Sequence, residues 1–159
     1  MVDMTRNEAS VIDESRFSVR RTIRIAASVE KVWQAITDPE HFSKWFGRIA
    51  FDGAGVGARG SITVEGFGVI PMRIEAIDEP RSISYRWGAD DAAGAPKAEV
   101  DEHSTVFTFT LEPVADGTQL TVVETGFERT SDPSANLDSH RRGWDEELDK
   151  LVALLESGA

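Results

Sequence analysis

Cysteine is absent from this chain of 159 residues. Its absence excludes disulfide bonds, thiolate metal sites and cysteine nucleophiles, and it is typical of proteins of the reducing cytosol. The chain has no apolar run long enough to span a bilayer, and residues 1–15 lack the apolar core of a signal peptide. We therefore expect a cytoplasmic protein without membrane insertion, in which a disordered leader over residues 1–15 precedes one domain over residues 16–159.

Positive charge is scarce. There are 17 Lys and Arg residues against 28 Asp and Glu residues, which gives a formal net charge of -11. An acidic surface repels nucleic acid and anionic membranes, so we predict neither as a partner. Hydrophobic residues make up 40% of the chain, which is ordinary for a globular domain that buries a sizeable core.

Residues that mark catalytic or cofactor sites are also few. There are three histidines, and none lies in a zinc or calcium motif. The acidic run with one histidine over residues 99–103 falls in a stretch typical of an exposed loop, so we interpret it as a solvated surface. No serine lies in a nucleophile elbow, and no histidine–carboxylate pair is apparent. We predict no metal, no cofactor and no catalytic residue.

One glycine-rich segment, Gly55-x-Gly57-x2-Gly60, matches the dinucleotide-binding pattern. That pattern needs a helix N-terminus directly after it to hold a pyrophosphate, whereas residues 61–65 have the pattern of a strand. We therefore interpret these residues as the glycines of hairpin turns.

What the chain does have is a long amphipathic helix near its C-terminal end, predicted over residues 134–155. Its apolar residues recur at helical spacing, and charged residues occupy the other faces. The apolar stripe consists of Leu137, Trp144, Leu148, Leu151, Val152 and Leu155. Because nearly all of residues 49–127 has the pattern of strands, this single long helix has to bury its stripe on a sheet. A curved sheet around one helix readily leaves a hollow that can take a small molecule.

The remaining elements can be placed by the same reasoning. Residues 16–25 alternate between apolar and polar, with Phe17 on the inner side, which predicts a half-buried strand. Ser28 and Asp38 are the expected N-caps of two short helices. Six further strands and a long surface loop over residues 89–104 come before the long helix. The predicted fold class is α+β, a curved antiparallel β-sheet wrapped around a long C-terminal α-helix, with two short helices after the first strand.

This order of elements resembles the helix-grip fold of the START-like (SRPBCC) superfamily. Five short blocks, in family order over residues 17–155, resemble bacterial homologues of the activator of the heat-shock protein 90 ATPase. The blocks are Ile23-x-Ile25-x-Ala27-x2-Glu30-x-Val32-Trp33, Thr37-Asp38-Pro39-Glu40-His41-x3-Trp45-Phe46, Glu79-Pro80-Arg81-x-Ile83-x-Tyr85-x-Trp87, Asp116-Gly117-Thr118-x-Leu120-Thr121-x3-Thr125-Gly126-Phe127 and Gly143-Trp144-x3-Leu148-x2-Leu151.

The resemblance implies the fold and says little about function. Co-chaperone activity belongs to eukaryotic members with an additional N-terminal domain, so the resemblance gives little support to direct stimulation of a chaperone ATPase. The sequence departs from the family in two places. The loop over residues 89–103 is longer than the family leads us to expect, and Glu124 stands where relatives often carry a histidine.

Strand alternation turns two charged side chains, Arg21 and Glu124, toward the inner face. A buried charge has to be paired, hydrogen-bonded or in contact with water. Each is therefore either a ligand anchor in a cavity or a residue that a bulge or strand end turns outward. His140, four residues before Trp144, borders the helix stripe as a partly exposed residue or as a polar group at the cavity rim. The candidate ligand-binding residues are Trp87, Phe109, Val122, Trp144, Leu148, Tyr85, Arg21 and Glu124.

These residues favour a cytoplasmic binding module for a small, mostly apolar ligand held between the sheet and the C-terminal helix, with a role in stress or regulation left open. One alternative is a cyclase- or dehydratase-type enzyme that uses the same cavity, with Glu124, Arg21 or Tyr85 as its polar groups. Another is a co-chaperone-like protein-interaction module that uses the outer face of the sheet. The sequence does not decide whether the protein is a monomer or a homodimer.

Overall fold

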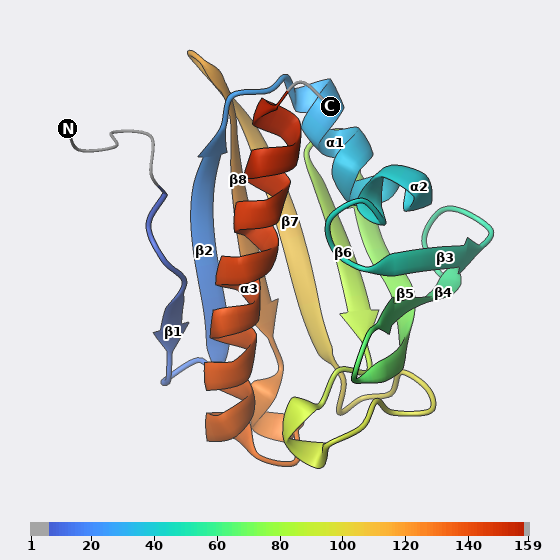
Figure 1. Cartoon of the computed structure of the whole chain (residues 1–159). Helices are drawn as coiled ribbons and strands as arrows, with labels where there is room; N and C mark the ends of the chain where they lie inside the picture. Colours follow the sequence, from blue (N-terminus) through green and yellow to red (C-terminus); the bar gives the residue numbers. More distant parts are fainter. Residues whose placement is uncertain (1–6, 158–159) are drawn as a thin grey trace.

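The computed structural model describes residues 7–157 (Figure 1). Residues 1–6, where the expected leader begins, and residues 158–159 lie outside the described residues. The strands are β1 (Val11–Asp13), β2 (Ser18–Ile25), β3 (Arg48–Asp52), β4 (Arg59–Val64), β5 (Gly68–Asp78), β6 (Ser82–Trp87), β7 (Thr105–Val114) and β8 (Gly117–Thr125). The helices are α1 (Val29–Thr37), α2 (Pro39–Phe42) and α3 (Pro133–Glu156), with two single 3₁₀ turns, η1 (Asp91–Ala93) and η2 (Phe127–Arg129).

The eight described strands form one antiparallel sheet in the order β1-β2-β8-β7-β6-β5-β4-β3. Figure 1 shows α3 running along the strands, in front of β8 and between β2 and β7, while α1 and α2 cover one end of the sheet beside β6. The α+β fold class and the predicted order of elements are therefore confirmed. The glycine-rich segment before β4 leads into a strand and not into a helix, as the sequence predicts.

The expected leader over residues 1–15 is wrong for the part that the structure describes. Val11–Asp13 form β1, which pairs with Ser18–Arg20 at the edge of the sheet. Just before it, Ser10 donates two hydrogen bonds to Asp145 of α3, at 2.7 and 2.6 Å. The segment buries few apolar side chains, so apolar periodicity gives no signal, and backbone pairing with β2 stabilises it instead.

Phe17 also differs from the prediction. Its φ is +48°, so it lies in the turn between β1 and β2 and not in the strand, and its side chain is exposed. From Val19 onward β2 alternates as predicted, with Ile23 and Ile25 buried.

Helix α3 begins where the sequence predicts. The side chain of Asp132 accepts a hydrogen bond from the backbone N–H of Ala135, and Pro133 occupies the first turn, where its missing N–H costs nothing. Leu148 and Leu151 of the predicted stripe are fully buried, whereas Val152 is half-buried. Two polar residues, Asn136 and His140, share the buried face with the leucines; the sequence placed His140 at the border of the stripe and gave no sign of Asn136.

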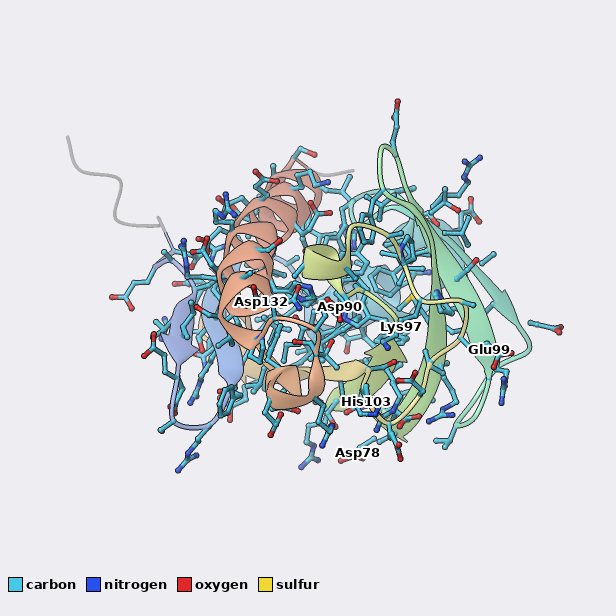
Figure 2. The ribbon with its side chains drawn as sticks, turned by 90° about the horizontal axis from the view of Figure 1, so that it is seen from below. Asp78, Asp90, Lys97, Glu99, His103 and Asp132 are labelled. Atoms are coloured by element: carbon cyan, nitrogen blue, oxygen red, sulfur yellow. The ribbon has the colours of Figure 1, made fainter. Side chains whose placement is uncertain are left out.

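The stretch between β6 and β7 is the surface loop expected over residues 89–104, but its first part is tied to α3. Asp90 is 5% exposed, and its carboxylate accepts hydrogen bonds from the backbone and hydroxyl of Ser131 and from the amide of Asn136, at 2.7 to 2.9 Å. Figure 2 shows Asp90 beside the start of α3, close to Asp132, with the rest of the loop extending away from the helix. These contacts bring η1 against α3.

Candidate functional site

A cleft of about 1340 Å³ opens between α3, the turn that follows α2, and the hairpin that joins β4 to β5. It is larger than the 300–1,000 Å³ typical of small-molecule sites. Helix α3 supplies one wall, and the start of the loop after β6 closes one end. The lining residues include Phe46, Arg48, Ile62, Val64, Phe67, Ile70, Trp87, Ala89, Asp91, His140, Gly143, Trp144, Glu147 and Lys150.

Three stacked aromatic rings lie at the inner end of the cleft. The ring of Phe46 lies 5.6 Å from that of Trp87 and 5.6 Å from that of Trp144, with interplanar angles of 23° and 17°. Phe46 reaches this place because Asp38 caps α2 and Pro39 starts it, so that the chain turns back toward the sheet directly afterwards. The three rings give this end of the cleft a rigid apolar surface.

Gly143 keeps the α3 wall of the cleft open. It lies in the middle of α3 and lines the cleft, and apart from the backbone of its own helix no atom lies within 4 Å of the place where a Cβ would stand. A glycine inside a helix costs about 1 kcal/mol relative to alanine. An alanine would fit here, so the close packing of neighbours does not explain this glycine.

Glu124 lies behind the aromatic rings and is fully buried. One carboxylate oxygen accepts hydrogen bonds from Trp87 Nε1 at 2.8 Å and Thr105 Oγ1 at 2.5 Å, and the other accepts from Trp144 Nε1 at 2.9 Å and His140 Nδ1 at 2.8 Å. Strand β8 turns this side chain inward, since Glu124 is in phase with the buried Val122. Both of its oxygens are thus satisfied inside the protein.

His140 joins this network to the cleft. Its side chain is 3% exposed, with Nδ1 on Glu124 and Nε2 at 3.4 Å from a carboxylate oxygen of Asp91. Burial alone would lower the pKa of His140, but the two carboxylates outweigh it and raise the pKa to about 10. Burial alone would likewise raise the pKa of Glu124, but the charge of His140 and hydrogen bonds from His140, Thr105 and Trp87 lower it. The two residues form a buried ion pair.

This pair contradicts the sequence-based interpretation that no histidine–carboxylate pair is present. Glu124 and His140 stand 16 residues apart, on β8 and α3, and their meeting depends on how the helix lies across the sheet. A histidine in phase with Leu137 and Trp144 on the helix was the one available signal. A histidine that keeps its proton at neutral pH can donate a hydrogen bond but cannot act as a general base.

Arg21 is buried, as alternation along β2 predicts, but it faces α3 and does not line the cleft. Its guanidinium donates to the backbone carbonyls of Trp144 and Asp145 and to the carboxylate of Asp149, at 3.4, 3.0 and 2.8 Å. A fourth hydrogen bond, at 2.8 Å, goes to the carbonyl of Glu8. All of these partners are protein groups, so Arg21 fastens α3 and the N-terminal segment to the sheet.

The other predicted site residues divide into two groups. Trp87 and Trp144 line the cleft, and Glu124 holds the indole N–H of each. The remaining four are fully buried in the core and are not lining residues; they are Tyr85, Phe109, Val122 and Leu148. The hydroxyl of Tyr85 donates to the carbonyl of Ile36 at 2.6 Å, and burial raises the pKa of this phenol.

Sequence reasoning missed Asp91, which η1 places at the cleft. Its carboxylate accepts a hydrogen bond from Ser139 at 2.6 Å and faces His140. Burial acts to raise the pKa of Asp91, but His140 and Ser139 lower it overall. The composition of the loop, rich in Asp, Ala and Gly, gave no signal that part of it is packed.

Over residues 7–157 no group of three or more His, Asp or Glu side chains is arranged to hold a metal ion. None of the helices in the described part of the chain is long and apolar enough to cross a membrane.

Comparison with known proteins places this geometry in a family. No curated protein matches the chain. Protein MLL2253 of Mesorhizobium loti is similar in structure, with a TM-score of 0.74, 28% identity, and coverage of 89% of this chain and 98% of that chain. Protein Ms6760 of Mycobacterium smegmatis has a TM-score of 0.69 and 22% identity, with coverage of 94% and 97%.

DynU16, a protein in the dynemicin biosynthetic locus, has a TM-score of 0.70 and 22% identity; the match covers 89% of this chain and 48% of DynU16. At 22% identity the likeness shows the fold alone. The family described as Activator of Hsp90 ATPase homolog 1-like protein matches residues 26–156, which is most of the chain. The sequence blocks, the sheet around α3 and this match agree, and the chain belongs to that family within the START-like superfamily.

Proposed function

We propose that the protein is a cytoplasmic binding module for a small, mostly apolar ligand held in the cleft between the sheet and α3. The observation that carries this proposal is the open wall at Gly143. A domain selected only for stability would gain from alanine there, whereas a ligand that lies against α3 gains from the missing side chain.

The aromatic end of the cleft supplies binding energy. Removing apolar surface from water contributes about 25 cal/mol per Å². Phe46, Trp87 and Trp144 each expose less than a tenth of their surface, so most of the gain comes from the apolar surface that the ligand itself buries against them, about 2.5 kcal/mol for each 100 Å² before the cost of association. Because Glu124 holds the Trp87 and Trp144 indoles in place, little side-chain entropy is lost on binding.

A cyclase- or dehydratase-type enzyme that uses the same cleft is the second candidate. Two observations favour it: His140 is a charged donor that could stabilise negative charge developing on a carbonyl oxygen, and the similar DynU16 is a protein in a biosynthetic locus. Incubation with a bound ligand separates the candidates. A binding module returns the ligand unchanged in mass and ultraviolet spectrum, whereas an enzyme converts it.

A neutral apolar dye, N-phenyl-1-naphthylamine, tests the binding proposal by its fluorescence on titration. We expect saturable binding to the wild type and to Gly143→Ala, which adds one methyl group. Gly143→Trp should fill the cleft and reduce dye affinity at least tenfold. Ala153→Trp is the matched control, since it places the same ring on an exposed position of the same helix, outside the cleft.

Circular dichroism and a cooperative denaturation curve verify that each variant is folded. If the folded wild type binds no dye, or if Gly143→Trp binds as well as Ala153→Trp, the ligand does not occupy this cleft and the proposal fails.

A further inference from the structure

We propose that His140 is the polar anchor of the cleft, and that it selects a ligand with a neutral hydrogen-bond-accepting oxygen, such as a ketone, over both a carboxylate and a plain hydrocarbon. This inference rests on the proposed function and adds the chemical class of the ligand's polar group.

The inference begins from Nε2 of His140, a buried nitrogen without a hydrogen-bond partner. His140 is 5% exposed and lines the cleft, and its Nε2 is buried without a hydrogen-bond partner. Asp91 lies 3.4 Å from this nitrogen, which is a charge contact without hydrogen-bond geometry. Buried polar atoms are nearly always hydrogen-bonded, and an unpaired one is a cost to stability. A ligand atom that pairs with Nε2 would remove this cost.

The second step is the protonation of the ring. Nδ1 lies 2.8 Å from Glu124, whose carboxylate can only accept, so Nδ1 carries a proton. Nε2 faces a second carboxylate, that of Asp91, which favours a proton on this nitrogen too. With both nitrogens protonated, Nε2 is a donor, and its partner on a ligand has to be an acceptor.

The third step is the charge of that acceptor. The charged residues that line the cleft or lie directly behind it are Arg48, His140 and Lys150 on the positive side, and Glu65, Asp91, Glu124 and Glu147 on the negative side. The negative groups outnumber the positive ones, and the chain as a whole carries a formal charge of -11. Lys150 is already paired with Glu147 at 3.0 Å. A carboxylate would therefore meet repulsion from Asp91 and Glu124, whereas a neutral carbonyl would not.

The last step is access. The side chain of Asp91 is 35% exposed and that of His140 is 3% exposed, so Asp91 lies on the solvent side of Nε2. Asp91 is fixed by one side-chain hydrogen bond from Ser139, on the single turn η1. A small outward rotation of this carboxylate opens Nε2 to a ligand oxygen, and Asp91 stays close enough to repel a second negative charge there.

Three naphthalenes of matched shape test the inference: 2-ethylnaphthalene, 2-acetylnaphthalene and 2-naphthoate, each titrated against bound N-phenyl-1-naphthylamine at pH 7. The hydrophobic effect alone predicts tightest binding for the ethyl compound, the most apolar of the three. A hydrogen bond from charged Nε2 reverses that order, so we expect the ketone to bind about tenfold more tightly than the hydrocarbon. The carboxylate should bind at least tenfold more weakly than the ketone.

A paired variant tests the role of His140. Glu124→Gln/His140→Leu removes both charges together, so that neither stays buried alone. We expect the ketone to lose its advantage while the hydrocarbon binds as before. If this variant does not fold, the wild type decides by nuclear magnetic resonance: 2-acetylnaphthalene should shift the Nε2 resonance of His140, and 2-ethylnaphthalene should not.

The outcomes separate the two proposals. Failure of N-phenyl-1-naphthylamine itself to bind overturns the proposed function. If the dye binds and 2-acetylnaphthalene does not displace it, the cleft stands and the role of His140 is overturned. Binding of the ethyl compound as tight as that of the ketone, or tightest binding of naphthoate, leaves an apolar cleft but overturns the role of His140.

Discussion

Glu124 and His140 form an ion pair of 2.8 Å in which both side chains are closed to solvent. Glu124 comes from the end of strand β8 and His140 from the first half of α3, so the pair joins the two layers of the fold. Taking two charges out of water is costly, and the pair is tolerated because hydrogen bonds from Trp87, Thr105 and Trp144 satisfy the carboxylate.

Breaking this pair from one side should be more damaging than removing both partners. Glu124→Gln leaves a buried imidazolium facing a neutral amide, and His140→Leu leaves a buried carboxylate. Each should lower the free energy of unfolding by about 3–5 kcal/mol. The double variant should lose clearly less than the sum, because neither charge is left alone. Urea denaturation of the four proteins measures this; additive losses would show that the two residues are not coupled.

The pH dependence of stability should carry the signature of the same pair. The folded pKa of His140 is raised from its ordinary 6.5 to about 10, so its contribution is full below pH 6.5 and is lost as the pH rises toward 10. The pKa of Glu124 is lowered from 4.5, so its contribution is full above pH 4.5 and is lost as the pH falls below that value. Asp91, the other carboxylate that faces His140, acts in the same direction as Glu124.

We therefore expect stability to decrease between pH 6.5 and 10 by up to about 1.4 kcal/mol per pH unit. Urea midpoints at several pH values measure the slope. Glu124→Gln/His140→Leu is the control and should lose most of it, since it removes the group that titrates. The same slope in the double variant would assign the effect to other groups.

Trp144→Ala should be among the most damaging single substitutions. Truncating a buried tryptophan costs about 3–5 kcal/mol, and here Glu124 also loses a hydrogen bond. Trp144→Phe is the intermediate case, since it keeps one aromatic ring against Phe46 but removes the indole N–H and part of the ring volume. Chemical denaturation should place it between the wild type and Trp144→Ala. An unchanged midpoint for Trp144→Ala would contradict the packing described above.

The two parts of the loop after β6 should differ in their rates of amide hydrogen exchange. Residues 94–102 have few contacts to bury and should exchange and be cleaved first within the described part of the chain. Residues 90–92 should be protected, because Asp90 and Ala92 are hydrogen-bonded to Asn136 of α3. Asp90→Ala should extend fast exchange into this part. Uniform protection over residues 90–102 would show that the whole loop is packed.

The sequence by itself determined the elements from β2 to α3 and the burial of most of their apolar side chains. Alternation along β8 placed Glu124 on the inner face, and helical spacing placed Leu148 and Leu151 in one buried stripe. These patterns are local, because a strand repeats every two residues and a helix about every 3.6. The caps Ser28 and Asp38 were readable for the same reason, since a cap bonds to residues two or three positions away.

Only the tertiary structure decided what the inward-facing residues meet. Arg21 and Glu124 give the same signal in the sequence, yet Arg21 binds carbonyls of α3 while Glu124 holds His140 at the cleft. The difference arises because α3 crosses the sheet in one particular position, which depends on packing over more than 100 residues of intervening chain. Periodicity fixes which face a side chain is on, but not which partner stands opposite it. The edge strand β1 and the attachment of Asp90 to α3 escaped prediction for the same reason, since backbone pairing and hydrogen bonds between distant segments leave no apolar pattern in the sequence.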